Sequence, residues 1–178
     1  MKFRRFSTEK LFDLLKNACL KEAIYWTGDR QYPDTDDLVK TSERDEMVSF
    51  LLEVCDRSDI KFSVETFALC ISLLDRFLAN FKVKSKYLEC LAVACLYVAA
   101  KIKEDDEKIS ITSEFLVDCN CKCKISELLR MELMLLGKFE FNVNDITVVD
   151  FLSICQSLLI NKYVEMFKID LPVRGGSA

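Results

Sequence analysis

The stretch "CLAVACLYVAAKIKEDDE", residues 90–107, decides the fold of this chain. It runs without a charge from Cys90 to Ala100 and then meets Lys101 and an acidic cluster. A membrane-spanning helix needs about 20 apolar residues, whereas a run this short is typical of a buried core helix. Its apolar residues lie all around the helix, which indicates a helix surrounded by other helices. We therefore predict the central helix of a bundle, with Lys101 where that helix leaves the core.

The flanking sequence repeats the helical pattern on both sides of this segment, because apolar residues recur every three or four positions. We predict helices over residues 8–26, 43–57, 64–81, 85–103 and 126–137, a short helix over 112–117 and a last helix after Thr147. Ser42, Ser63 and the Thr147-x-x-Asp150 pattern are the predicted N-terminal caps. The segment "KFEFNVND", residues 138–145, alternates like a strand but lies alone between helices, so we predict an extended loop. The predicted fold class is all-α, with a frayed tail after about residue 167.

The composition excludes several classes of function. The 178 residues are 51% hydrophobic and 30% charged, which is typical of a globular chain. The net charge of −4 argues against a nucleic-acid surface, which is normally basic. The absence of histidine excludes a histidine base and most catalytic zinc sites, and no glycine-rich loop is present to hold a phosphate. We therefore expect an interaction domain without enzymatic activity or a cofactor.

The amino terminus and the cysteines indicate an intracellular protein. "MKFRRFSTEK" is charged and no apolar stretch with a cleavage site follows it, so we predict no signal peptide, no membrane partner and a location in the nucleus or cytoplasm. The nine cysteines are predicted to be reduced thiols, mostly small core residues. Cys119-x-Cys-x-Cys lacks the separated pair of ligands that a structural zinc site needs, so we predict no metal and rank a small metal module last.

Four stretches, in this order and at these spacings, resemble a cyclin box: "RDEMVSFLLEV" from Arg44, "ETFALCISLLDRFLA" from Glu65, "KYLECLAVACLYVAAKIKEDDE" from Lys86 and "LLRMELMLLGKFEFNV" from Leu128. The match covers residues 41–158, and the acidic run and the "CKC" are most similar to the G-type and I-type cyclins. The resemblance implies a five-helix bundle around its third helix, with an additional N-terminal helix outside it. We therefore divide the chain into an N-terminal helix and connector (1–40), a cyclin box (41–145) and the truncated start of a second repeat with a flexible tail (146–178).

The same resemblance implies a function. Cyclins bind a cyclin-dependent protein kinase and reposition its regulatory helix, so the chain would be a non-enzymatic regulatory subunit in cell-cycle or related control. Lys101 and Glu132 would then hydrogen-bond backbone groups of the kinase helix, with Leu91 near the contact surface. We expect both charged groups to lie near the protein surface. The residues alone leave another interpretation open, in which Lys101 is a helix C-terminal cation and Glu132 a partly buried acid paired with Lys101 or Arg130.

The resemblance also implies an internal ion pair between Arg44 and Asp75, which would tie the first box helix to the second. One feature departs from the family pattern: Glu43 and Glu46 stand where an apolar docking patch is expected, and Phe50 stands where tryptophan is frequent. This weakens the expectation of substrate docking there. The alternative function is a helical adaptor that kept the box scaffold but activates no kinase.

The second departure is that only the first helix of a second repeat follows the box, which fits a short isoform, a fragment or a diverged single-box member. Its apolar residues need a partner surface: Val148, Phe151, Leu152 and Leu158. This helix must therefore fold back on the box or leave a patch exposed. We expect weak self-association.

Overall fold

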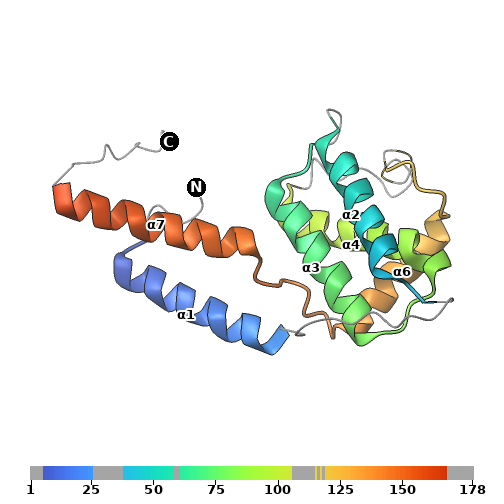
Figure 1. Ribbon diagram of the computed structural model, residues 1–178, viewed down its shortest axis with the longest axis horizontal. Helices are drawn as coiled ribbons and strands as arrows, with labels where there is room; N and C mark the ends of the chain where they lie inside the picture. Colours follow the sequence, from blue (N-terminus) through green and yellow to red (C-terminus); the bar gives the residue numbers. More distant parts are fainter. Residues whose placement is uncertain are drawn as a thin grey trace.

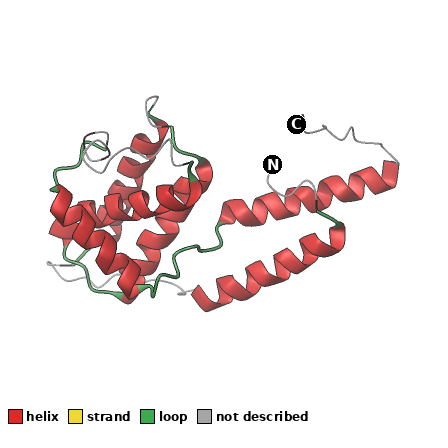
Figure 2. Ribbon diagram, turned by 180° about the vertical axis from the view of Figure 1, so that it is seen from behind, coloured by secondary structure: helices red, strands yellow, loops and turns green. Residues whose placement is uncertain are grey.

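The computed structural model describes residues 6–25, 38–57, 61–105, 115, 117 and 119–167. Within them the regular elements are α1 (Thr8–Tyr25), α2 (Thr41–Asp56), α3 (Val64–Asn80), the 3₁₀ turn η1 (Ser85–Tyr87), α4 (Leu88–Lys103), α6 (Ile125–Lys138) and α7 (Val148–Phe167). Figure 2 shows helices joined by loops, and the described extended pairing is an isolated bridge between Leu38 and Lys84. The predicted all-α fold class is confirmed.

α4 lies in the centre of the bundle, as its uninterrupted apolar sequence predicts. Every residue from Leu91 to Ala100 is buried, and Tyr97 is the most exposed of them at 5%. Helices α2, α3 and α6 pack around it (Figure 1). Because its neighbours approach from all sides, many of its positions hold small residues such as Ala92 and Ala94. Glu89 and Cys90 at its start, and the residues from Lys101 onward at its end, are less enclosed.

The start of α3 is fastened to the end of α4. The Ser63 hydroxyl accepts a hydrogen bond from the Thr66 backbone N–H at 3.2 Å, which confirms Ser63 as the cap. Glu104, the residue after α4, accepts from the Ser63 N–H at 2.7 Å and from the Thr66 hydroxyl. The acidic cluster after α4 is therefore not only solvated charge, because its first carboxylate holds two helices together.

Several predicted boundaries differ from the structure. α2 begins at Thr41 rather than Glu43, so Ser42 lies inside the first turn and Lys40 is the capping residue. The cause is Glu43, whose carboxylate accepts from the Lys40 N–H at 2.8 Å and so satisfies the helix end. α7 continues to Phe167, beyond the apolar run that predicted it.

The segment after α6 is a turn rather than an extended loop. Residues 138–145 form no strand, as predicted, but the chain turns there, with positive φ angles at Glu140 (51°) and Phe141 (59°). The helix predicted over 112–117 lies outside the described residues except for Phe115 and Val117. The predicted tail after residue 167 also lies outside them.

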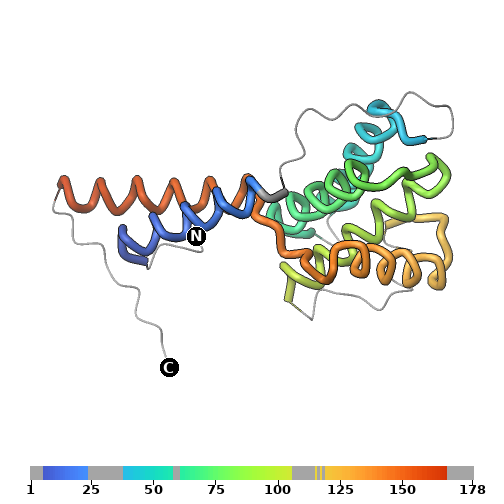
Figure 3. The backbone as a smooth tube through the Cα atoms, turned by 90° about the horizontal axis from the view of Figure 1, so that it is seen from below, coloured from blue at the N-terminus to red at the C-terminus, as the bar shows by residue number. Residues whose placement is uncertain are grey.

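α1 and α7 form a two-helix arm that projects from the bundle (Figures 1 and 3). They come from opposite ends of the sequence but pack against each other, and the Asn161 side-chain amide donates to the Phe6 carbonyl at 3.0 Å. The predicted cap of α7 is confirmed, because the Asp150 carboxylate accepts from the Thr147 N–H at 3.1 Å. α7 therefore does not fold back over the bundle, and it touches α3 only near its start. None of the described helices combines the length and apolar character that a membrane span requires.

Candidate partner-binding site

Lys101 and Glu132 meet where α4 leaves the core. The Lys101 Nζ lies 2.7 Å from the Glu132 Oε1 and 4.1 Å from the centre of the Tyr97 ring. The Lys101 side chain is 41% exposed, whereas that of Glu132 is only 12% exposed. The pair thus presents an ammonium to solvent above a carboxylate that is largely enclosed.

The pattern of α6 explains why Glu132 is enclosed. Leu128 and Leu135 are fully buried against the core, and Glu132 lies between them on the same helical face. A carboxylate in that position needs a charged or hydrogen-bonding partner. Of the two partners that the sequence allows, Lys101 is the one that the structure places on it. The expectation that both groups lie near the surface therefore holds for Lys101 but not for Glu132.

Exposed apolar side chains lie to one side of Glu132 on α6. Leu133 is 68% exposed and Leu129 is 40% exposed, and both lie within one turn of Glu132. Leu136 and Ile102 are partly buried beside them, and Phe141 in the following turn is 72% exposed. A charged pair in an apolar surface of this kind is typical of a protein interaction site.

Leu91 does not belong to this surface. Its side chain is fully buried, since α4 is covered on all sides until its last turn. It cannot contact a partner without opening the core, so its expected role near the contact surface is corrected. The sequence held the contrary signal, because Leu91 lies inside the run whose all-round apolar pattern predicts burial.

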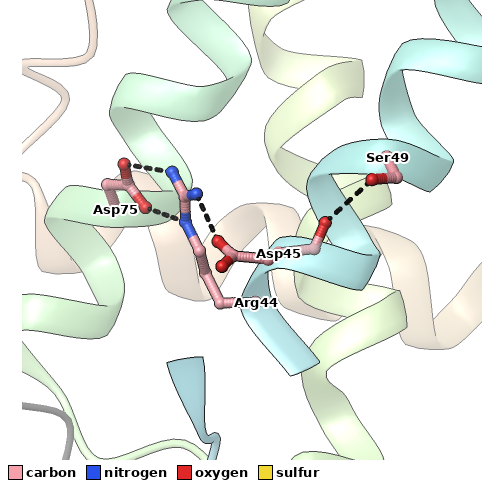
Figure 4. A network of polar contacts seen from close by, with 4 residues as sticks. All are labelled: Arg44, Asp45, Ser49 and Asp75. Carbon is pink, nitrogen blue, oxygen red and sulfur yellow. Dashed lines mark hydrogen bonds and ion pairs between the residues drawn. The ribbon is translucent and has the colours of Figure 1, made fainter. Parts of the chain in front are cut away.

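Arg44 and Asp75 form a two-pronged ion pair between α2 and α3 (Figure 4). The Arg44 Nε lies 2.9 Å from Asp75 Oδ1, and its Nη2 lies 2.7 Å from Oδ2. Both side chains retain about a fifth of their exposure, 21% and 23%. The guanidinium also donates to Asp45, 2.9 Å away on the same helix. This is the structural pair that the family resemblance implies.

Sequence reasoning missed a second and more deeply buried ion pair. The Arg76 Nη1 lies 2.7 Å from the Asp145 Oδ1 and also donates to the Asn142 carbonyl at 2.8 Å. The guanidinium lies 4.1 Å from the centre of the Phe139 ring. Burial raises the pKa of the Asp145 carboxyl, and Arg76 opposes that rise. The sequence holds one hint of this pair, which is that Arg76 directly follows Asp75 on one helix. Adjacent helical residues point toward different neighbouring elements, so the two side chains face different partners.

Three thiols gather beside the start of α6. The Cys121 and Cys123 Sγ atoms lie 3.1 Å apart, and Cys90 hydrogen-bonds to Cys123. Burial raises the pKa of Cys121 to about 12 and that of Cys123 to about 11, so both thiols are protonated at neutral pH. Among the described residues, no group of three or more cysteine or acidic side chains is arranged to hold a metal ion.

Comparisons with known proteins concern the family and the fold of this chain. A family model for the cyclin N-terminal domain matches residues 13–144. Cyclin-G1 of Mus musculus is 35% identical over 98 residues, which is 55% of this chain and 33% of the relative. Cyclin-G2 of Homo sapiens is 36% identical over 96 residues, which is 54% of this chain and 28% of the relative. The matched part therefore spans a third or less of these relatives.

The fold has a solved counterpart. The X-ray structure of a viral cyclin from herpesvirus saimiri superposes with a TM-score of 0.66 at 20% sequence identity. The match covers 88% of this chain and 63% of that structure. At this level of identity the likeness concerns the fold alone.

Proposed function

This chain belongs to the cyclin family, and from that premise we propose that it is a regulatory subunit that binds a cyclin-dependent protein kinase. Membership of the family supports a regulatory rather than a catalytic role, and the similarity to cyclins G1 and G2 supports a G-type cyclin box. We further propose that it acts in cell-cycle or related control, in the nucleus or cytoplasm. That the partner is a kinase, and that binding changes its activity, are both part of this proposal.

The observation that carries the proposal is the Lys101–Glu132 pair within an exposed apolar surface. Backbone groups at the end of a partner helix lack intrahelical hydrogen bonds and are ready to accept from an ammonium or donate to a carboxylate. Lys101 has three N–H donors and Glu132 has two oxygens, so one mutual bond leaves capacity for a partner. Leu129 and Leu133 would supply the apolar contacts.

The proposed mechanism is differential binding. A kinase helix that moves between two positions is shifted toward the one that the cyclin surface binds more tightly. The Lys101 side chain suits this task, because the Tyr97 ring and Glu132 hold its ammonium in one place before any partner arrives. Such preorganisation reduces the entropy that binding must overcome.

The test is affinity capture from a cell extract with the 178-residue chain as bait, followed by mass spectrometry for kinases. The variant Leu133→Asp places a charge on the proposed surface at a position that is 68% exposed, so folding should be preserved. Its matched control is Leu52→Asp on α2, which is 53% exposed and far from the pair in sequence. We expect kinase recovery to fall with the first variant and to stay unchanged with the second.

A second variant tests the charged pair itself. Lys101→Met alone would leave the Glu132 carboxylate enclosed and unpaired, which lowers the stability of the chain. A loss of kinase capture could then come from unfolding rather than from the missing contact. The double change Lys101→Met with Glu132→Leu removes both charges and should keep the fold. Loss of one charge-assisted hydrogen bond corresponds to roughly a ten- to hundredfold loss of affinity. A folded double variant that captures the kinase at the wild-type level would contradict the role of the pair, and a wild-type chain that captures no kinase would contradict the function.

The alternative is an adaptor that binds proteins without activating a kinase. It is favoured by the polar character of the start of α2, where the Glu43 carboxylate accepts from the Ser85 hydroxyl at 3.0 Å. An acidic surface there does not suit an apolar substrate motif. Kinase activity measured on the captured complex separates the two functions, since only the regulatory subunit changes the rate.

A further inference from the structure

α7 carries an exposed apolar stripe on the face turned away from α1. We define the α7 stripe as Val148, Leu152, Cys155, Leu159, Tyr163 and Met166. Each of its five large members is more than 60% exposed, and Cys155 is exposed as well. The buried residues Ile154 and Ser157 lie on the opposite face of the helix. Among the residues that the structure describes, one long side of α7 thus has no neighbour within the arm (Figure 1).

The spacing of the α7 stripe is that of a helix-pairing seam. Successive members are separated by four, three, four, four and three residues, which approximates the alternating a and d positions of a coiled coil. None of the six is charged, whereas Lys162 and Glu165 lie beside the stripe. The stripe therefore fits the apolar side of another helix over a length of about 30 Å.

We propose that the α7 stripe is the interface between two copies of this chain, which pair their α7 helices in antiparallel orientation. The stripe matches itself to within one residue when it is reversed. With the two-fold axis near Ser157, Val148 lies opposite Met166, and Cys155 lies opposite Leu159. Leu152 falls opposite Lys162 and one residue, about 1.5 Å of helical rise, from the level of Tyr163, so a second copy covers most of the stripe with apolar contacts.

The antiparallel orientation of the two α7 helices follows from the position of the bundle. The bundle is attached at the amino end of α7 and is wider than the arm on both sides (Figure 3). Two packed helices lie about 8–10 Å apart, so parallel pairing would bring two bundles into the same space. Antiparallel pairing sets them at opposite ends of the helix pair. The bundle surface that carries Lys101 remains outside this interface.

The size of the stripe indicates a weak dimer. Each of the six side chains would bury on the order of 100 Å² of surface in the contact, which amounts to on the order of 600 Å² per copy. Stable protein interfaces bury about 800 Å² per partner, so this contact lies at the weaker end of that class. We therefore expect a dissociation constant of roughly micromolar or weaker.

The first experiment measures mass against concentration by analytical ultracentrifugation. The variant Leu152→Glu with Leu159→Glu places charges in the middle of the stripe, at positions 63% and 64% exposed. The control Leu52→Glu with Val64→Glu makes the same change at exposed positions of the bundle. Wild type and control should dimerise alike, and the stripe variant should stay monomeric at about tenfold higher concentration. A wild-type chain that stays monomeric at millimolar concentration, or a folded stripe variant that dimerises as before, overturns the proposal.

The second experiment tests the orientation in a Cys19→Ser background. The change Leu159→Cys places a thiol opposite Cys155 of the other copy, and oxidised glutathione should then convert the two thiols to a disulfide while it is reduced to two glutathione molecules. Cys155 alone should give no covalent dimer, because antiparallel pairing offsets the two Cys155 residues by about 6 Å along the axis. A covalent dimer through Cys155 alone would indicate parallel pairing, and the absence of cross-linking in Leu159→Cys would contradict the proposed register.

Discussion

Neighbouring residues Asp75 and Arg76 fasten α3 in two directions. Asp75 receives Arg44 from α2, and Arg76 reaches Asp145 beyond α6. The two pairs differ in burial, because Asp75 keeps 23% of its side-chain exposure and Asp145 only 3%. Their loss should therefore have different consequences for stability and for its dependence on pH.

The first prediction concerns Arg44. Arg44→Ala removes both hydrogen bonds to Asp75 and should lower the free energy of unfolding by about 3 kcal/mol, since both side chains keep only about a fifth of their exposure. Arg44→Lys keeps the charge but loses the two-pronged geometry, so its effect should be intermediate. Urea unfolding measures both, and an Arg44→Ala chain as stable as wild type would show that the pair contributes nothing.

The second prediction concerns Arg76. Arg76→Met leaves the Asp145 carboxylate buried without its cation and should cost about 3–5 kcal/mol at pH 7. Burial already raises the pKa of Asp145, and loss of Arg76 removes the main opposing charge, so the pKa should rise further. When the pKa of a carboxyl is higher in the folded than in the unfolded protein, its contribution to stability is complete below the unfolded-state pKa. That contribution is lost as the pH rises through the folded-state pKa. The Arg76→Met defect should therefore be smaller near pH 4 than at pH 7, and adding Asp145→Leu should remove this dependence.

At the scale of elements, the junction of α3 and α4 rests on Glu104. Its carboxylate accepts from the Ser63 N–H and the Thr66 hydroxyl, two groups at the start of α3. Glu104→Ala should lower the free energy of unfolding by about 1–2 kcal/mol, the usual effect of losing a helix cap. The matched control is Asp105→Ala at the next, exposed residue, which should leave thermal stability unchanged. Equal melting temperatures for the two variants would contradict the capping role.

α4 and α7 differ although both are rich in apolar residues. α4 is covered on all sides by three helices, whereas α7 is covered by α1 along one side. The apolar side chains that α7 leaves exposed explain why the arm is the part of the fold that we expect to self-associate. Of the four apolar residues that raised the alternatives for this helix, Val148 and Leu152 are exposed, whereas Phe151 and Leu158 are partly buried.

For the molecule as a whole, the buried thiols predict alkaline instability. Burial raises the pKa of Cys55 to about 12 and raises those of Cys70 and Cys95 as well. These thiols stay protonated in the folded chain while they ionise near pH 9 in the unfolded chain. Their contribution to stability is complete below pH 9 and should fall above it by about 1.4 kcal/mol per pH unit for each thiol.

The measurement is chemical unfolding between pH 7 and pH 11. Cys55→Ala with Cys95→Ala should lower stability at pH 7, because it removes core volume, but should make the decline above pH 9 less steep. A decline of equal slope in both chains would show that other groups control it.

The sequence by itself determined the helices, because their signals are local. The period of the apolar residues, Ser63 at the start of α3 and the Thr147–Asp150 cap are encoded within a few residues of the structure that they form. The all-round apolar run of α4 also indicated its central place, since no other position shields every face of a helix. Lys101 at the end of that helix followed directly.

Only the tertiary structure decided which faces meet. It enclosed Glu132 beneath Lys101, joined Arg76 to a loop 69 residues away, and placed α1 beside α7. The physical reason is that periodicity states which side chains share a face but not which distant element covers that face. That choice depends on how all the helices pack at once, and the same packing left the α7 stripe open.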